Sequence, residues 1–365
     1  MKNIKILHTA DLHLDSAFEA LPAGKAAIRR AEQRELLSRL AELARSERAD
    51  IVLLAGDIFD GGGTYFETGA EFVRCLRDMS VPVFIAPGNH DPYDARSPYA
   101  KLDIPQNVRI FTERDVECAE LPELGVRVYG AAFTGSTDGP DITNIRTERA
   151  EGTWNILCAH GEVGFDPVNE QALSASGLDY AALGHIHKAS GLRRSGGTWY
   201  SWPGCPEGRG FDETGEKTVS IVELSDSGCR LTPVCIASRR YEILPVEVTG
   251  CDPLLAVHTV LPENTARDVY RIVLTGEVDT PPDLSRLRRN LDDCFFSLQL
   301  RDETRLRQDV WERAEEDSLR GIFLRKLHEK YNSAQSEERE LIEQAARWGL
   351  AALDNMEEVV RHEDK

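Results

Sequence analysis

The stretch YAALGHIHK, residues 180–188, joins an apolar run to two histidines that lie one residue apart. The apolar run predicts a buried strand that ends at the first histidine. Because residues two apart in an extended segment point to the same side, His185 and His187 leave the backbone in one direction at the strand's carboxyl end. A metal site needs that arrangement. A turn that carries two polar residues is the alternative, and the rest of the chain decides between them.

Short β-rich runs alternate with helical patterns from the start of the chain to about residue 240. In the segment 26–45, leucines at 36, 37, 40 and 43 recur at helical spacing. The alternation predicts an α/β domain. Two later runs, 218–224 and 230–236, are separated by the turn sequence SDSG and predict a hairpin in a mixed sheet. The earlier strand-like runs are 4–10, 51–56, 82–88, 126–133, 154–160 and 180–185.

The pattern changes twice towards the carboxyl end, which predicts three parts. These are a main domain over 1–238, a small α+β domain over 239–304 and a helical, highly charged region over 305–365. An apolar stripe runs along the last helical segment and predicts either packing on its own domain or docking of a partner. The stripe consists of Leu341, Ala345, Trp348, Ala352, Met356 and Val360.

The chain of 365 residues carries a formal net charge of −19. A generic electrostatic nucleic-acid binder has a basic footprint, so this charge argues against that class. A polyanionic substrate would need local help from metal ions, from arginines such as Arg193 and Arg194, or from a second subunit. The eight cysteines include no C-x-x-C pair, which predicts thiols in a reducing cytoplasm. No window approaches the ~20 apolar residues of a membrane span.

Acids, an amide and imidazoles follow five of the predicted strands. Since ligands of α/β sheets bind outside the carboxyl ends of the strands, we expect these side chains to meet at one edge. Carboxylate, amide oxygen and imidazole without thiolate suit two divalent ions in open coordination, such as Mn, Fe or Zn. The residues, in chain order, are Asp11 and His13; Asp57 and Asp60; Asn89, His90 and Asp91; His160; and His185 and His187.

The order D-x-H, G-D-x-x-D, G-N-H-D, H-G and G-H-x-H resembles that of calcineurin-like metallophosphoesterases over residues ~4–190. The segments HTADLHLDSAF, GDIFD, APGNHD, LGHIHK and PGCPEGRGFDETGEK are similar to those of SbcD-type DNA double-strand-break repair exonucleases, especially the YhaO-like branch. Beyond residue 240 the likeness is architectural only. The resemblance implies an α/β fold, a metallophosphoesterase β-sandwich flanked by helices, with a small α+β capping domain and a helical tail.

The resemblance also implies roles for particular residues. His90 would steady the transition state or protonate the leaving oxygen, with Asp91 orienting it. Asp60 departs from relatives that place a catalytic histidine there, and we expect it to be a turn residue or a supporting carboxylate; Asp15 is expected to be a turn or helix-capping residue. Seven side chains are implied as metal ligands: Asp11, His13 and His187 for one ion, Asn89, His160 and His185 for the other, with Asp57 bridging them.

Three functional hypotheses follow. The first is a Mn²⁺-dependent DNA nuclease in DNA repair, with exonuclease activity either alone or together with single-strand endonuclease activity. It would act by in-line attack of hydroxide on phosphorus, and Fe²⁺, Zn²⁺ or Mg²⁺ are alternative ions. The second is a phosphodiesterase acting on nucleotides or other small phosphodiesters, which the acidic charge favours. The third is a partner-binding subunit, because the resemblance implies an SbcC-like ABC-type ATPase partner; whether the chain also forms a homodimer is left open.

Overall fold

The computed structural model describes residues 1–61, 63–140, 142, 145–163, 167–168, 170–307 and 310–353. Met356 and Val360 of the predicted apolar stripe lie outside these residues. The chain falls into two compact units, one made of residues 1–246, 257–273 and 284–301 and the other of residues 247–256, 274–283 and those from Asp302 onward. The three-part division at 238 and 304 stays a prediction.

The first sheet has six strands in the order β14-β13-β1-β2-β3-β4. Strands β1 to β4 are parallel, β13 pairs antiparallel with β1, and β14 completes the predicted hairpin. The sheet is therefore mixed, as the sequence predicts. Its strands are β1 (Ile4–Thr9), β2 (Ile51–Leu54), β3 (Val83–Ile85), β4 (Val108–Ile110), β13 (Thr218–Ser225) and β14 (Gly228–Cys235).

The second sheet also has six strands, in the order β11-β12-β10-β7-β6-β5. The four inner strands are parallel, and the two edge strands, β11 and β5, pair antiparallel. Its strands are β5 (Glu117–Leu121), β6 (Val126–Gly130), β7 (Trp154–His160), β10 (Tyr180–Gly184), β11 (Arg193–Ser195) and β12 (Thr198–Ser201).

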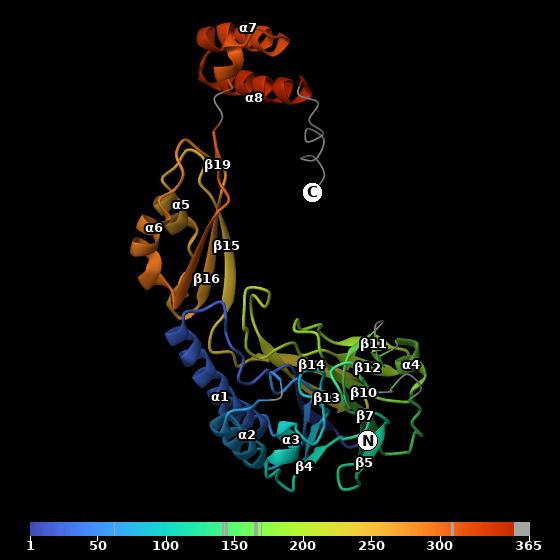
Figure 1. The fold of residues 1–365 in the computed structure, drawn as a ribbon. Coiled ribbons are helices and arrows are strands. Elements are labelled where there is room, and N and C mark those ends of the chain that lie inside the picture. The colour runs from blue at the N-terminus through green and yellow to red at the C-terminus, as the bar shows by residue number, and fades with distance from the viewer. Residues whose placement is uncertain are drawn as a thin grey trace. The chain divides into compact units, whose positions relative to one another are not determined.

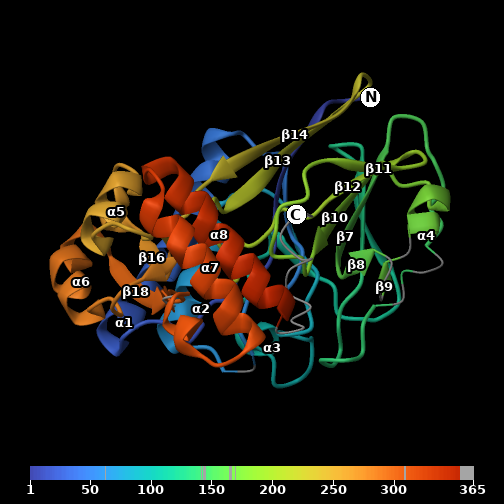
Figure 2. The same cartoon turned by 90° about the horizontal axis from the view of Figure 1, so that it is seen from above.

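The two sheets pack face to face, with helices on the outside (Figures 1 and 2). Residues that alternate along a strand enter different cores because the side-chain period is two. In β2, Ile51 and Leu53 enter the core between the sheets, whereas Val52 and Leu54 pack under the helices α1 (Ala23–Ser46) and α2 (Phe66–Asp78). All four side chains are buried, which explains why the strand reads as a continuous apolar run.

The remaining elements of the first unit include a small sheet, in the order β15-β16-β18. Figures 1 and 2 show α6 on one face of this sheet, where it buries Leu287 and Leu291. The elements are β15 (Tyr241–Glu247), β16 (Val269–Thr275), β18 (Ser297–Asp302) and α6 (Leu284–Leu291), together with α3 (Pro98–Lys101), α4 (Glu170–Ala175), β8 (Glu162–Val163) and β9 (Pro167–Val168). Helix α5 (Pro253–Val260) is divided between the two units after residue 256.

The second unit contains a helix pair, α7 (Leu319–Ser333) and α8 (Ser336–Leu353), and the short strands β17 (Glu277–Val278) and β19 (Arg305–Leu306). Helix α8 packs on α7 through Ala346 and Leu350. The predicted stripe lies elsewhere on α8, because Leu341 and Trp348 are each 67% exposed. Its described large residues are therefore not the packed face of the helix.

The carboxyl ends of the strands make unusually tight turns. Asp11, His13, Asp57 and His185 all have positive φ, between 44° and 99°. Left-handed backbone at residues other than glycine is strained and is typical of functional sites. At Gly184 a Cβ would lie 1.8 Å from the carbonyl oxygen of Ala55, so only glycine allows β10 to approach β2 here.

We predict that Gly184→Ala lowers the melting temperature by about 5 °C or more, because overpacking against a backbone carbonyl costs at least ~1–3 kcal/mol. Gly24→Ala in α1 is the matched control, since its Cβ would meet nothing within 4 Å. Thermal unfolding of both variants measures the difference. Equal melting temperatures for the two variants would contradict the close approach at Gly184.

Candidate metal centre

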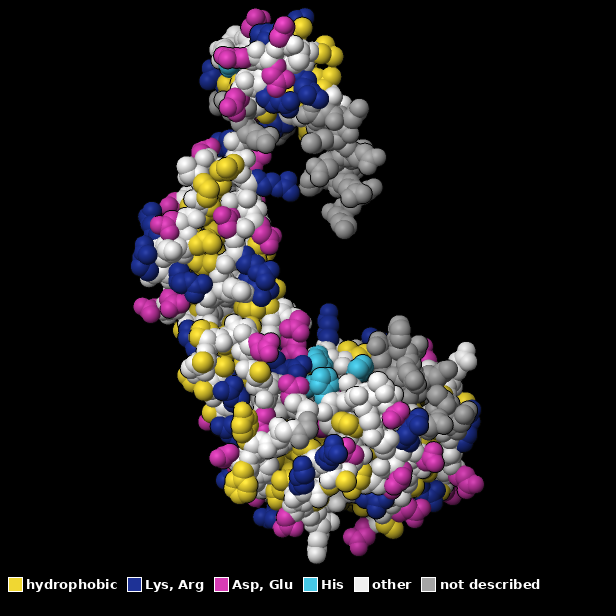
Figure 3. Space-filling model, in the orientation of Figure 1, with side chains coloured by type: hydrophobic (Ala, Val, Ile, Leu, Met, Phe, Trp, Pro, Cys, Tyr) yellow, Lys and Arg dark blue, Asp and Glu magenta, His cyan; other side chains and the backbone are white. Residues whose placement is uncertain are grey.

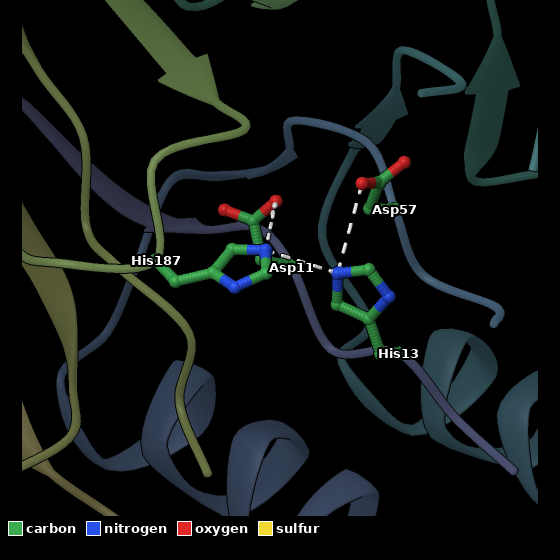
Figure 4. Close-up of side chains that lie close together, drawn as sticks. All are labelled: Asp11, His13, Asp57 and His187. Atoms are coloured by element: carbon green, nitrogen blue, oxygen red, sulfur yellow. Dashed lines mark hydrogen bonds and ion pairs between the residues drawn. The ribbon is translucent and has the colours of Figure 1, made fainter. Parts of the chain in front are cut away.

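One cluster of donor atoms joins the turn after β1 to the loop after β10 (Figure 4). The Nε2 atoms of His13 and His187 lie 3.2 Å apart. His13 Nε2 is 3.6 Å from Asp57 Oδ2, and His187 Nε2 is 3.9 Å from Asp11 Oδ1. The four side chains place one donor atom each within 4.8 Å of the others. Two ring nitrogens that face each other beside two carboxylates form a donor set suited to a cation.

A second cluster shares Asp57 with the first. Asp57 Oδ2 lies 3.3 Å from His160 Nε2, which is in turn 3.1 Å from the side-chain oxygen of Asn89. Asp57, His160 and His185 also bring their donor atoms within 4.8 Å of one another. The carboxylate of Asp57 therefore stands between two groups of donors, as a bridging ligand requires.

The donor set fits two divalent ions on chemical grounds. It contains carboxylates, one amide oxygen and imidazoles, and no thiolate. The hydrogen bond from His160 Nδ1 to the carbonyl oxygen of Ala55, at 2.8 Å, directs Nε2 towards Asp57. Glu213 Oε1 lies 2.7 Å from Nδ1 of His187 and fixes that ring in the same way. A metal-binding histidine typically donates its other ring N–H to a carbonyl or carboxylate oxygen in this way.

The ionisation of the buried donors is coupled. Burial disfavours a charged imidazole, but the nearby carboxylate of Asp57 raises the pKa of His160 to about 9. Burial raises the pKa of Asp11 to about 6. Burial also opposes the charged form of Asp57, yet the attraction of His160 keeps the pKa of Asp57 well below its usual range. The metal-free centre therefore holds a proton on His160 at neutral pH.

His90 lies beside the first cluster, at its open side. Its ring packs edge-on against His13 with centroids 4.9 Å apart, and its side chain is 47% exposed. Asp60 Oδ1 lies 3.4 Å from Nδ1 of His90 and 3.3 Å from Nδ1 of His13, while Ser16 donates to Asp60 Oδ2 at 3.0 Å. The hydrogen bond with His13 lowers the pKa of Asp60 to about 2. Asp60 is thus a supporting carboxylate that contacts two imidazoles.

Asp91 occupies a different position from the one expected. Its buried carboxylate accepts hydrogen bonds from the Tyr99 hydroxyl and from the backbone amides of Gly88, Asp57, Ile58 and Phe59. These contacts tie the turn after β2 to the turn after β3. The expectation that Asp91 orients His90 is corrected accordingly, because its oxygens are engaged by backbone amides and Asp60 is the carboxylate beside the His90 ring.

Two residues to which the sequence patterns assign no role also contact the centre. Glu213 holds His187, and Arg209 lies 2.7 Å from Glu213 and 3.2 Å from His187 Nδ1. Both belong to the segment PGCPEGRGFDETGEK, whose resemblance to the exonucleases was the available signal. Asp15 accepts hydrogen bonds from the Tyr65 amide and the Thr68 hydroxyl, so it caps the start of α2.

Figure 3 shows histidine side chains at the surface next to acidic and basic side chains. Two donor clusters that share a carboxylate, at the strand ends of an α/β sandwich, define a metal-dependent phosphoester hydrolase. A family model described as calcineurin-like phosphoesterase matches residues 4–189, and the chain belongs to this family. Such a hydrolase uses two divalent metals, for which the clusters around Asp57 are the candidate site.

Curated relatives extend the likeness beyond the matched domain. The metallophosphoesterase YhaO of Bacillus subtilis is 26% identical, over 82% of this chain and 78% of the relative. The DNA double-strand break repair protein Mre11 of Saccharolobus solfataricus is 24% identical, over 75% of this chain and 76% of the relative. The SbcD component of the nuclease SbcCD of Bacillus subtilis is 26% identical, over 60% of this chain and 66% of the relative. The chain thus fits the SbcD-type, YhaO-like branch.

Two further sequence predictions concern the whole chain. All eight cysteines are free thiols in the structure. Among the described residues, no helix is both long enough and apolar enough to cross a membrane.

We predict that Mn²⁺ binding to the metal-free protein releases about one proton per chain at pH 7, because His160 must lose its proton to coordinate. Below pH 9 His160 is protonated, so affinity falls as the pH is lowered, and it falls further below pH 6, where Asp11 takes up a proton. Calorimetric titration in two buffers of different ionisation enthalpy measures the protons released. Affinity that is constant from pH 6 to pH 9, without proton release, would contradict the coupling.

Proposed function

We propose that the chain is a metal-dependent DNA nuclease that hydrolyses phosphodiester bonds in DNA repair. The observation that carries the proposal is the position of Asp57 Oδ2, 3.6 Å from His13 Nε2 and 3.3 Å from His160 Nε2. One carboxylate between two donor groups supports a dinuclear centre, which suits phosphodiester hydrolysis. The names of two relatives, a DNA double-strand break repair protein and a component of a nuclease, support DNA as the substrate.

The proposed ligands divide between the two ions as the resemblance implies. Mn²⁺ is the proposed metal, because the hard and borderline donors suit it, with Fe²⁺, Zn²⁺ or Mg²⁺ as alternatives. When bound, the ions neutralise charge on the phosphate and make water nucleophilic at neutral pH. The residues that would hold the ions are Asp11, His13 and His187 for one, Asn89, His160 and His185 for the other, and Asp57 for both.

His90 is the proposed catalytic residue. Asp60 beside Nδ1 holds the ring, which leaves Nε2 to donate a proton to the leaving oxygen. Three ligands, Asp11, His13 and His160, are fully buried, so water is excluded from one side of the centre. Asp91 holds the turns after β2 and β3 together, because its carboxylate accepts hydrogen bonds from backbone amides of both.

The acidic chain needs local cations to receive a polyanion. Arg193 and Arg194 on the edge strand β11 are exposed and lie over Trp202 and Trp199, at 5.8 and 4.8 Å from the ring centres. Basic and aromatic side chains together suit contact with a nucleic-acid strand. These arginines are therefore one proposed DNA contact.

We predict that the protein digests end-labelled DNA in the presence of Mn²⁺ and that His90→Gln lowers the rate by about 100-fold or more, the usual contribution of a general acid. Because His90 is not a proposed ligand, the variant should keep its metal, which elemental analysis measures. His258→Gln, a histidine exposed on α5, is the control and should keep full activity.

Two outcomes would contradict the proposal. Intact DNA alongside rapid turnover of a small chromogenic phosphodiester would favour the alternative substrate class, nucleotides or other small phosphodiesters, and weak salt dependence of the rate would support that reading. Loss of metal from His90→Gln would show that this residue belongs to the ligand set.

A second function is favoured by the exposed face of α8. Leu341 and Trp348 are seven residues apart, so they lie on one side of the helix, and both are largely exposed. We infer that this face docks an SbcC-like ABC-type ATPase, in keeping with the relatives named as components of SbcCD.

A second copy of the chain is a further proposed partner. The free thiols support a cytoplasmic location.

We predict that the double variant Leu341→Glu, Trp348→Glu no longer co-purifies with a co-expressed SbcC-type ATPase, because two charges replace the apolar contact. Activity on a small chromogenic phosphodiester should be unchanged. Leu255→Glu, at a leucine 64% exposed on α5, is the matched control. Co-purification that survives the double variant would exclude this face of α8 as the docking surface.

A further inference from the structure

Two arginines occupy one face of the small sheet of the first unit. Arg271 lies on β16, and its Nε donates a hydrogen bond to the side-chain oxygen of Gln299 on β18 at 2.5 Å. Arg301 is two residues beyond Gln299 in the same strand, so its side chain leaves the sheet on the same side. Figure 3 shows Lys and Arg side chains gathered on the surface over β15 and β16.

Several arginines of this unit are neutralised by an acidic partner, but among the residues that the structure describes these two guanidinium groups are not. Arg29, Arg209 and Arg239 each lie 2.6–2.7 Å from a carboxylate oxygen. In the described part of the chain, no carboxylate pairs with Arg271 or Arg301. Burial, and then the charge of Arg301, lower the pKa of Arg271, which places the two cations within each other's field. An unneutralised cation pair in a chain of net charge −19 is suited to an anionic ligand.

The cation pair is connected to the metal centre through one short segment. The guanidinium of Arg271 stacks on the ring of Phe211, 3.9 Å from its centre. Two residues away on either side of Phe211 are Arg209 and Glu213, which contact His187. The stacking fixes the Arg271 side chain, so less conformational entropy is lost when it binds a ligand.

We propose that Arg271 and Arg301 bind backbone phosphates of the DNA strand whose scissile phosphodiester occupies the metal centre. The proposal rests on the proposed DNA nuclease function and adds a second, metal-independent contact to it. Guanidinium groups match phosphate oxygens with two parallel hydrogen bonds, and Gln299 adds an amide donor. A small phosphodiester fills only the metal centre, so the cation pair acts on polymeric substrates alone.

Arg301→Ala is the decisive variant because Arg301 is exposed and forms no ion pair with any residue that the structure describes, so its loss leaves the fold intact. We expect DNA affinity to fall several-fold, and the slope of log affinity against log salt to become shallower by ~0.7–0.9, the value for one lost phosphate contact. Fluorescence anisotropy of labelled DNA with the full chain in EDTA measures both quantities. Turnover of a small chromogenic phosphodiester with Mn²⁺ should be unchanged, and Arg301→Lys should restore most of the affinity.

Arg230→Ala is the matched control, since Arg230 is an exposed arginine on β14 and its loss changes the net charge equally. It should leave DNA affinity and the salt slope unchanged. If the wild-type protein binds DNA with a steep salt dependence and Arg301→Ala behaves like Arg230→Ala, the phosphate contact is refuted while the nuclease function stands. If the wild-type protein neither binds nor digests DNA, both proposals are refuted.

Discussion

The carboxylate of Asp57 is the constraint on which the rest of the structure depends. It lies at a left-handed turn after β2, buried, with one oxygen directed at imidazoles from two different loops. A charge buried in this way is stable only if cations or hydrogen-bond donors surround it. His13, His160 and the backbone amide of His90, which donates to Asp57 Oδ1 at 2.9 Å, supply those partners in the metal-free protein. The strand ends are thereby held together before any ion arrives.

Supporting carboxylates then fix each ligand-bearing segment. Asp91 binds backbone amides on two turns, Asp60 contacts His13 and His90, and Glu213 holds His187. Glu213 also forms an ion pair with Arg209, and the ring of Phe211, midway between these two residues in the sequence, stacks against the guanidinium of Arg271. The centre and the small sheet are therefore linked by one segment whose side chains contact both. In our proposal, this segment links the two places that a DNA strand contacts.

The donors of the centre could be predicted from the sequence because a simple rule governs them. Parallel strands deliver their carboxyl ends to one edge, so polar residues directly after apolar runs meet there. The roles of the supporting residues could not be predicted in this way. Glu213 follows His187 by 26 residues, and the chain between them forms β11 and β12 before it returns to the centre. The contacts of Asp60 and Asp91 depend on left-handed turns that local sequence does not specify. On α8, burial of Ala346 and Leu350 is decided by the neighbouring helix α7, which the apolar stripe alone does not reveal.

Anomalous scattering from crystals grown with Mn²⁺ tests the central claim most directly. Our account predicts two peaks per chain, ~3.5–4 Å apart, with a carboxylate oxygen of Asp57 bound to both. His13 and His187 should border one peak, and His160 and His185 the other. A single peak, or peaks remote from Asp57, would contradict the dinuclear centre and with it the hydrolytic mechanism.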